Sequence, residues 1–378
     1  MRRLFFIIVC LAISQTLHSQ QNIPQLAVQS TVDTTNKIVA SVINVWQKYL
    51  NSRPDSISVN LYWSESEQHQ YKPFDLVGYT WWSPSLYTLA RYWKSGVVLS
   101  VSPIDSSYII RTMFYDSAPK DSGRINVHCI IQIAARIENG SYKLGNVLPI
   151  NTKYWHKERL GSITFICPQD HAFNRTLADS MNRFADSLAA LWQLPAVSVQ
   201  YFFADNLDRV TKALGFDYWP AEGNSSGRHG FTDVKNRIIY SGGSDEWYPH
   251  EFVHIYLNPL FPNAHYYFHE GYATFVGGSQ GHELRWHIRR NYQYLKDHPD
   301  VDVLSFKGVD PYVGPAYFIG GLLCKMAYDK GGVSLIRKLM TYGPEDEELY
   351  RAVHDVFGID KYHVNNFLRI NLARYELE

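Results

Sequence analysis

The stretch Trp247-Tyr-Pro-His-Glu-Phe-Val-His-Ile-Tyr-Leu-Asn258 decides how the rest of the chain is interpreted. It contains an HExxH pattern made by His250, Glu251 and His254. Residues four apart on a helix project from the same face, so both imidazoles can be aimed at one point. Zn²⁺ binds neutral imidazole, and catalytic zinc usually has three protein ligands and one position left for water. Glu251 lies about 100° further round the helix, where it can reach that water and act as a general base.

The residues around the pattern favour a buried helix. Pro249 fits the first turn, where its missing N–H costs nothing, and Ser244 and Asp245 are candidate caps before it. The remaining positions up to Leu257 are mostly apolar. The alternative interpretation is a pair of core histidines with a chance glutamate beside them, but a buried helix with these three side chains needs a reason.

A third ligand is needed, and the sequence offers Glu270, His269 and His265. The longer metalloprotease pattern HExxHxxGxxH is excluded, because Leu257 and Leu260 occupy its glycine and third histidine positions. What remains is a pattern in which a glutamate on a second helix completes the site.

HExxH, a short connection with Pro259 and Pro262, and then Glu270-Gly-Tyr-Ala273 together resemble the gluzincins. In particular, they resemble the bacterial peptidase MA-like proteins, which are related to the thermolysin and aminopeptidase groups. The resemblance covers roughly the last 220 residues. It implies that zinc is bound by His250, His254 and Glu270, that Glu251 is the base, and that His265 and His269 are neighbours of the site.

The first residues have the pattern of a secretory signal peptide. A basic start at Met1–Arg3 is followed by an apolar run from Leu4 to Ile13, which is short for a bilayer span, and then by polar residues. We expect residues 1–19 to be removed after Ser19 and the mature chain to be exported, either to the periplasm or outside the cell. Cys10 could suggest a lipoprotein, but the residues before it lack the small side chains that such processing needs.

Composition indicates a globular protein with balanced charge. The 36 basic and 36 acidic residues give no preference for nucleic acid, and no later stretch is apolar enough to span a membrane. The three mature cysteines, Cys129, Cys167 and Cys324, have no metal-binding spacing, so one disulfide or free buried thiols are both open. The oligomeric state is left open as well.

We expect an α+β protein with two domains. Residues 20–35 are polar and predict a linker. Residues 36–150 begin with a helix and continue with strand-like runs, and they resemble the cone of nuclear-transport-factor-like proteins. Trp81, Trp82 and Trp93 are candidates to line a pocket there, or simply to fill the cone.

Residues 157–378 make the expected gluzincin domain, which has a small sheet and a mostly helical C-terminal part. Strands are predicted over Gly161–Pro168, Val197–Phe203 and Asn236–Ser241, and residues 215–235 are expected to be a loop. By resemblance, Arg237 to Ser241 is the sheet edge that holds extended substrate. A second motif-like stretch, His282 to His287, spaces its histidines five apart and is expected to be a solvated helix face.

The resemblance also suggests a tyrosine that faces the metal at the start of a late helix. Tyr317 is the candidate and Tyr312 the alternate, and a phenol there can donate to an oxyanion. The chain lacks the G-x-M-E-N segment with which related aminopeptidases hold a free amine, so an endopeptidase is preferred. The sequence therefore predicts an exported zinc metallopeptidase acting on peptides or proteins. The alternative is a non-catalytic or zinc-stabilised binding protein of the cell envelope.

Overall fold

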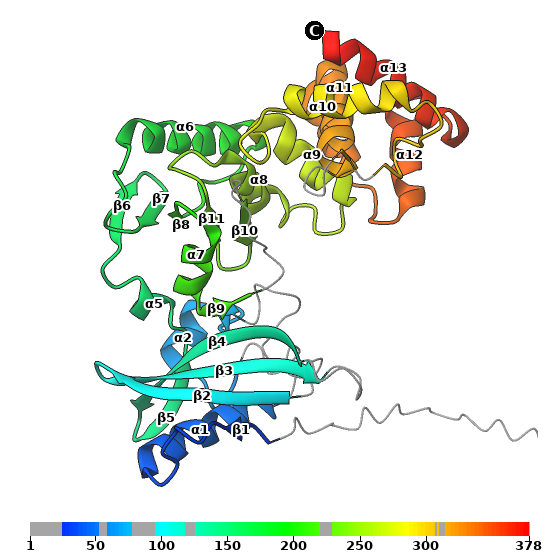
Figure 1. Cartoon of the computed structure of the whole chain (residues 1–378). Helices are drawn as coiled ribbons and strands as arrows, with labels where there is room; N and C mark the ends of the chain where they lie inside the picture. Colours follow the sequence, from blue (N-terminus) through cyan, green and yellow to red (C-terminus); the bar gives the residue numbers. More distant parts are fainter. Residues whose placement is uncertain are drawn as a thin grey trace, which may run out of the picture.

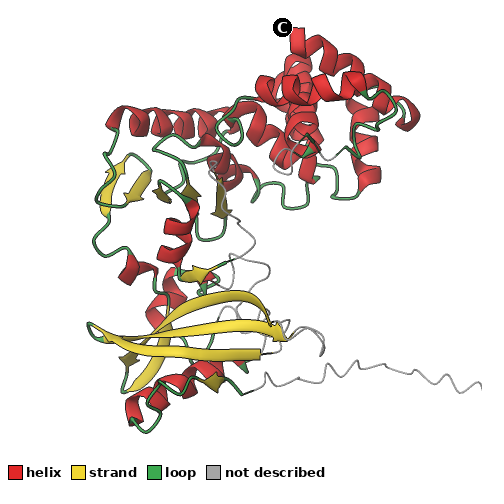
Figure 2. Cartoon of the chain, viewed as in Figure 1, coloured by secondary structure: helices red, strands yellow, loops and turns green. Residues whose placement is uncertain are grey.

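The computed structural model describes residues 25–52, 59–77, 95–117, 125–219, 229–306, 308–309 and 314–377. Two separate sheets and a helical C-terminal part give the α+β class that the sequence predicts. Figure 1 shows the long strands of the first sheet in cyan to blue-green, the second sheet in green, and the C-terminal helices in yellow-green to red. The same division of strands and helices is visible in Figure 2.

The first sheet follows the chain order β1-β2-β3-β4-β5, and β9 pairs with β4 beside β5. Short β1 runs parallel to β2, and the other pairs are antiparallel. β1 lies inside the predicted 20–35 linker, where Leu26 is buried in the core of this half. The strands are β1 (Ala27–Val28), β2 (Ser95–Ile104), β3 (Ser107–Ser117), β4 (Ile125–Glu138), β5 (Ser141–Gly145) and β9 (Phe216–Tyr218).

Two helices pack with this sheet. α1 (Lys37–Leu50) starts where the Asn36 side chain accepts from the Ile38 amide at 2.9 Å, and its Trp46 Nε1 donates to Thr112 of β3 at 3.0 Å. α2 (Glu65–Gln70) brings the buried Glu67 against the end of β5. The side chains of Trp81, Trp82 and Trp93 lie outside the described residues.

The second sheet has the order β10-β11-β8-β7-β6. Its three central strands are mutually parallel, and both edge strands are antiparallel to their neighbours. Apolar runs such as Val199–Ala204 are buried on both faces, which is typical of parallel strands. The strands are β6 (His156–Leu160), β7 (Ile163–Cys167), β8 (Val199–Ala204), β10 (His229–Asp233) and β11 (Ile238–Gly242).

The two faces of the second sheet belong to two different cores. Tyr201 and Phe203 point into the core that holds α6 (Arg175–Trp192) and the C-terminal helices. Phe202 and Tyr240 point to the other side, into the core that holds α1 and the first sheet, and α7 (Leu207–Leu214) packs there. The short α5 (Leu148–Asn151) connects the two halves. The second of these two cores therefore contains side chains from both halves of the chain.

The C-terminal part is helical. It consists of α8 (Pro249–Leu257), α9 (Tyr266–Gly277), α10 (Leu284–Asp297), α11 (Pro315–Leu339, kinked at Gly331 and Gly332), α12 (Asp346–Phe357) and α13 (Val364–Leu377). α9 and α11 touch at two glycines: a Cβ on Gly271 would lie 2.2 Å from the Gly320 carbonyl carbon. No side chain fits there, so the backbones of the two helices meet directly.

Most predicted elements are present, but the structure also has strands that the sequence did not predict. Residues 151–160, for which no strand was predicted, contain β6, and the expected loop 215–235 contains β9 and β10. Cys129, Cys167 and Cys324 are buried free thiols. Within the described ranges, no helix combines the length and the apolar character needed to cross a membrane. The predicted signal peptide lies outside those ranges, and the domain limits stay a prediction.

Candidate metal centre

α8 carries the HExxH pattern in a fully buried position between the second sheet and α9. Pro249 is in its first turn, and all nine of its residues are buried. The predicted caps are not at the helix start: the N-cap is Tyr248, and the Asp245 carboxylate instead accepts from the Trp247 amide at 2.9 Å. Burial on every side fixes the directions in which the polar side chains of α8 can point.

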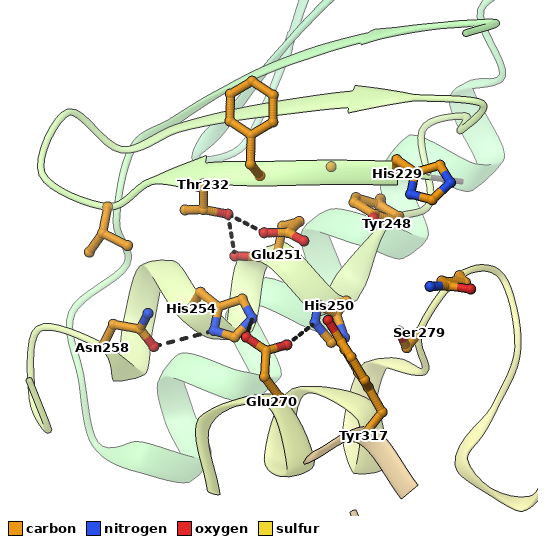
Figure 3. Close-up of a pocket in the computed structure, with 14 residues that line it drawn as sticks. His229, Thr232, Tyr248, His250, Glu251, His254, Asn258, Glu270, Ser279 and Tyr317 are labelled. Carbon is orange, nitrogen blue, oxygen red and sulfur yellow. Dashed lines mark hydrogen bonds and ion pairs between the residues drawn. The ribbon is translucent and has the colours of Figure 1, made fainter. Parts of the chain in front are cut away.

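His250, His254 and Glu270 converge on one point (Figure 3). One ligand atom from each residue lies within 4.8 Å of the others. His250 Nε2 is 3.2 Å from one Glu270 oxygen, and His254 Nε2 is 3.7 Å from the other. Glu270 reaches the histidines from α9, so two helices supply the three groups.

The outer nitrogens of both histidines hold the rings in place. His250 Nδ1 lies 2.6 Å from the Gly278 carbonyl, and His254 Nδ1 lies 3.3 Å from the Asn258 side-chain oxygen. Both partners can only accept, so each Nδ1 donates and each Nε2 faces the shared point. Metal-binding histidines typically donate their second N–H to such a partner. The donor set therefore fits a zinc ion.

The site is strongly polarised. Burial lowers the pKa of His254, but the charges of Glu270 and Glu251 outweigh it and raise that pKa to about 9. Burial likewise works to raise the pKa of Glu270, but the two histidines overcome it and hold that pKa well below its usual range. The carboxylate of Glu270 is therefore ionised.

Glu251 points away from Glu270 and toward β10 (Figure 3). Thr232 Oγ1 donates to Glu251 Oε2 at 2.5 Å and lies 3.4 Å from the Glu251 carbonyl oxygen. The carboxylate lines the same cavity as the two histidines and Glu270. It therefore stands beside the ligand group without belonging to it, as helix geometry predicts for the residue after His250.

Tyr317, in the first turn of α11, lies against the histidines. Its ring centroid is 6.1 Å from that of His250, and it lines the cavity. Burial, followed by the negative charge of Glu270, raises the pKa of Tyr317 far above its ordinary value. The phenol therefore keeps its proton and can donate a hydrogen bond. The alternate, Tyr312, lies outside the described residues.

The cavity at this site has a volume of about 320 Å³, and β10 forms one of its walls. This corrects the expectation for Arg237–Ser241. That stretch overlaps β11, which is paired on both sides, so it has no free edge. The edge strand is β10, which precedes β11 in the chain and pairs with it in an antiparallel hairpin on the side away from β8. A second cavity of about 350 Å³ adjoins the first at His250, Tyr248 and Ser279.

The other histidines have different roles. His269 Nε2 donates to the Phe261 carbonyl at 2.9 Å, and His265 accepts from the Tyr267 amide at the start of α9. Neither belongs to the converging group. The expected solvated face at His282–His287 is wrong. α10 begins only at Leu284, and His287 is fully buried with Nε2 3.0 Å from the Ser279 carbonyl.

Sequence reasoning missed three groups that complete the site. Asn258 follows His254 by four residues, so helical spacing alone could have indicated it. Gly278 contacts His250 through its backbone carbonyl. Thr232 contacts Glu251 from β10, a strand that was not predicted because the 215–235 segment is polar. No spacing in the sequence connects either of them to the motif.

No protein-family model matches the chain, and no curated protein sequence matches it. Among solved structures, it is similar to an M1 zinc metallopeptidase from Deinococcus radiodurans, at 13% identity over 75% of this chain and 64% of that one, with a TM-score of 0.34. It is also similar to a mutant of the Deinococcus radiodurans enzyme bound to a Tyr-Ser-Ala substrate, at 14% identity over 75% and 64% of the chains, with a TM-score of 0.32. A two-domain M1 mutant bound to L-arginine gives 13% identity, the same coverage and a TM-score of 0.32. The chain thus spans 64% of the length of these proteins, and the likeness assigns it to no family.

Proposed function

We propose that the chain is a zinc-dependent peptidase whose ligands are His250, His254 and Glu270. The observation that carries this proposal is the convergence of these three groups beside a cavity, with Glu251 lining that cavity but outside the ligand group. A zinc ion held there would lower the pKa of a bound water and polarise a substrate carbonyl.

The residues of the chain would then divide the work. Glu251 accepts a proton from the attacking water and passes it to the leaving amine, which is the role of a general base and then of an acid. Tyr317 donates from its protonated phenol to the oxygen on which charge develops. Gly278 and Asn258 hold the histidine rings so that each Nε2 faces the metal.

An endopeptidase is favoured over an exopeptidase. Of the described residues that line the cavity, only Glu251 and Glu270 are acidic, and both already have a role in the proposed chemistry. No further acid is therefore left in the described lining of this first cavity to bind a free amine, and Glu283 lines only the second one. The second cavity continues past His250, which gives room for chain on both sides of a scissile bond.

We further propose that the protein is exported, which the basic start and short apolar run of the sequence support. N-terminal sequencing of the secreted protein tests this proposal, and the first residue should be near Gln20. A chain that keeps its first 19 residues in a membrane would contradict it.

The experiment for the peptidase proposal combines metal analysis with hydrolysis of a peptide library, with and without a chelator. We expect one zinc per chain and activity that the chelator abolishes. Glu251→Gln should lower kcat by about 10²–10⁴-fold with zinc content and Tm unchanged, because only the base is removed. Tyr317→Phe should lose less, on the order of 10-fold.

The opposite result would be a parent protein that holds zinc but cleaves nothing in a broad library. If Glu251→Gln also left its biological role intact, the chain would be a zinc-stabilised binding protein and the peptidase proposal would be wrong.

A further inference from the structure

The edge strand β10 contacts the proposed base through one side chain. Thr232 Oγ1 lies 2.5 Å from Glu251 Oε2 and 3.4 Å from the Glu251 carbonyl oxygen. A hydroxyl has a single hydrogen to donate, so the shorter contact to the carboxylate is the effective bond. Bonds to an ionised acceptor are shorter and stronger than neutral ones.

β10 can come this close to α8 because of Gly230. A Cβ on Gly230 would lie 2.6 Å from the Tyr248 ring and 2.9 Å from the Tyr240 carbonyl oxygen, so no larger residue fits. Side chains alternate along a strand, which places Thr232 on the same face as Gly230. Phe231 faces the other way and stacks on Tyr240, with the two ring centroids 5.0 Å apart.

The contact leaves the two carboxylate oxygens of Glu251 unequal. Thr232 occupies Oε2, whereas the described residues form no hydrogen bond with Oε1. The threonine side chain is branched at Cβ and has few rotamers, so it is a stiff donor. Of its neighbours on β10, Phe231 stacks on Tyr240 and Asp233 accepts hydrogen bonds from Asn236, and the strand is paired with β11 along its length.

We propose that Thr232 is a positioning residue that fixes the Glu251 carboxylate and presents Oε1 to the cavity. Thr232 lines the cavity but does not belong to the converging group of His250, His254 and Glu270, and its proposed action on the chemistry runs through Glu251. The inference rests on the proposed peptidase function for its kinetic consequence, but the positioning itself can be observed without any turnover.

The test compares Thr232→Val, which has the same shape without a hydroxyl, with Thr232→Ser, which restores the hydroxyl. Thr164→Val is the matched control, because Thr164 is a half-buried threonine on β7 of the same sheet and lines neither cavity. Crystal structures of the parent and the three variants show the rotamer of Glu251. Steady-state kinetics on a cleaved peptide and zinc analysis accompany them.

We expect Thr232→Val to release the carboxylate from β10 and to lower kcat by about 10- to 100-fold, the scale on which small misplacements of a reacting group act. KM and zinc content should stay at the parent values. Thr232→Ser should restore both the rotamer and most of the rate, and Thr164→Val should change neither. If Thr232→Val does not fold, Thr232→Ala replaces it with the same expectations.

The proposal is overturned if the Glu251 rotamer is unchanged in Thr232→Val, or if Thr232→Ser behaves like Thr232→Val. A general loss of activity that Thr164→Val shares would overturn it too. If the rotamer changes as expected but the parent protein cleaves no peptide, the positioning role stands and the peptidase function alone falls.

Discussion

At the scale of single residues, Glu270 holds the site together. It is the only one of the three proposed ligands that comes from α9, and each of its oxygens faces a different histidine of α8. Its neighbour His269 points elsewhere and contacts the Phe261 carbonyl. Both residues were candidate third ligands from the sequence, but in the structure only Glu270 faces the two histidines.

We expect Glu270→Ala to lose most of its zinc. Removing a ligand should cost more than the roughly 10- to 100-fold in affinity that loss of an outer hydrogen-bonding partner costs. Asn258→Ala, which removes only the partner of His254, should fall within that smaller range. Titration with zinc against a competing chelator measures the zinc affinity of the parent, of Glu270→Ala and of Asn258→Ala.

His269→Ala is the matched control and should keep its zinc. Full occupancy in Glu270→Ala together with loss in His269→Ala would show that the third ligand has been assigned wrongly.

The sequence predicted the residues of the motif because they obey one local rule, the spacing of a helix. Asn258 obeys the same rule and could have been included. Thr232 could not, because its contact with Glu251 depends on how the β10–β11 hairpin folds back over α8. Contacts that are created by tertiary packing leave no local pattern.

At the scale of elements, β10 is the strand on which the site depends and also one that the sequence concealed. Its residues His-Gly-Phe-Thr-Asp lack the apolar run of a central strand. β6, at the other edge, is equally polar and was also missed. Edge strands owe their place to backbone pairing more than to side-chain burial, so hydrophobic periodicity indicates them poorly.

The turn after β10 is attached to the first half of the chain. The Asn236 side chain accepts from the Lys72 amide at 2.6 Å and donates to the Pro73 carbonyl at 3.1 Å and to Asp233 at 2.7 Å. One side chain thus joins the hairpin that carries Thr232 to a segment more than 160 residues earlier.

Asn236→Ala should lower the free energy of unfolding by about 1–3 kcal/mol, because it leaves several polar groups without their partner. Amide hydrogen exchange in β10 should become faster. Denaturant unfolding and exchange measured by mass spectrometry test the two effects.

Asn371→Ala is a suitable control, since the Asn371 amide donates to the Phe367 carbonyl within α13. Its effect should be smaller and should leave exchange in β10 unchanged. Equal effects of the two variants would mean that Asn236 has no special part in holding the hairpin.

At the scale of the whole molecule, the two halves are not independent in packing. β9 belongs to the second half of the sequence but pairs with β4 of the first sheet. Three side chains of the second sheet, Phe202, Ile238 and Tyr240, are buried in the core of the first half. The sequence suggested a division near residue 150 because a helix and strand-like runs come before it and the gluzincin-like part comes after it. It could not show that one face of the second sheet is covered by the first half.

We therefore expect the full chain to unfold in a single transition. Exposing side chains such as Phe202, Ile238 and Tyr240 costs about 1.5–3 kcal/mol each, a sum comparable with the net stability of a typical domain. Urea unfolding followed by circular dichroism and by tryptophan fluorescence should give superimposable curves. A fragment starting at residue 151 that kept a cooperative transition of its own would contradict this.

The direct meeting of α9 and α11 at Gly271 and Gly320 bears on how related chains can be recognised. Glu270 directly precedes one glycine, and Tyr317 precedes the other by three residues, so the helix crossing sets the distance between acid and phenol. A side chain at either glycine would push the helices apart and separate the two groups. A search for distant relatives should therefore require a small residue in the late helix as well as the Glu-Gly pair. Chains with the motif but bulky residues at both positions must build the site on a different crossing.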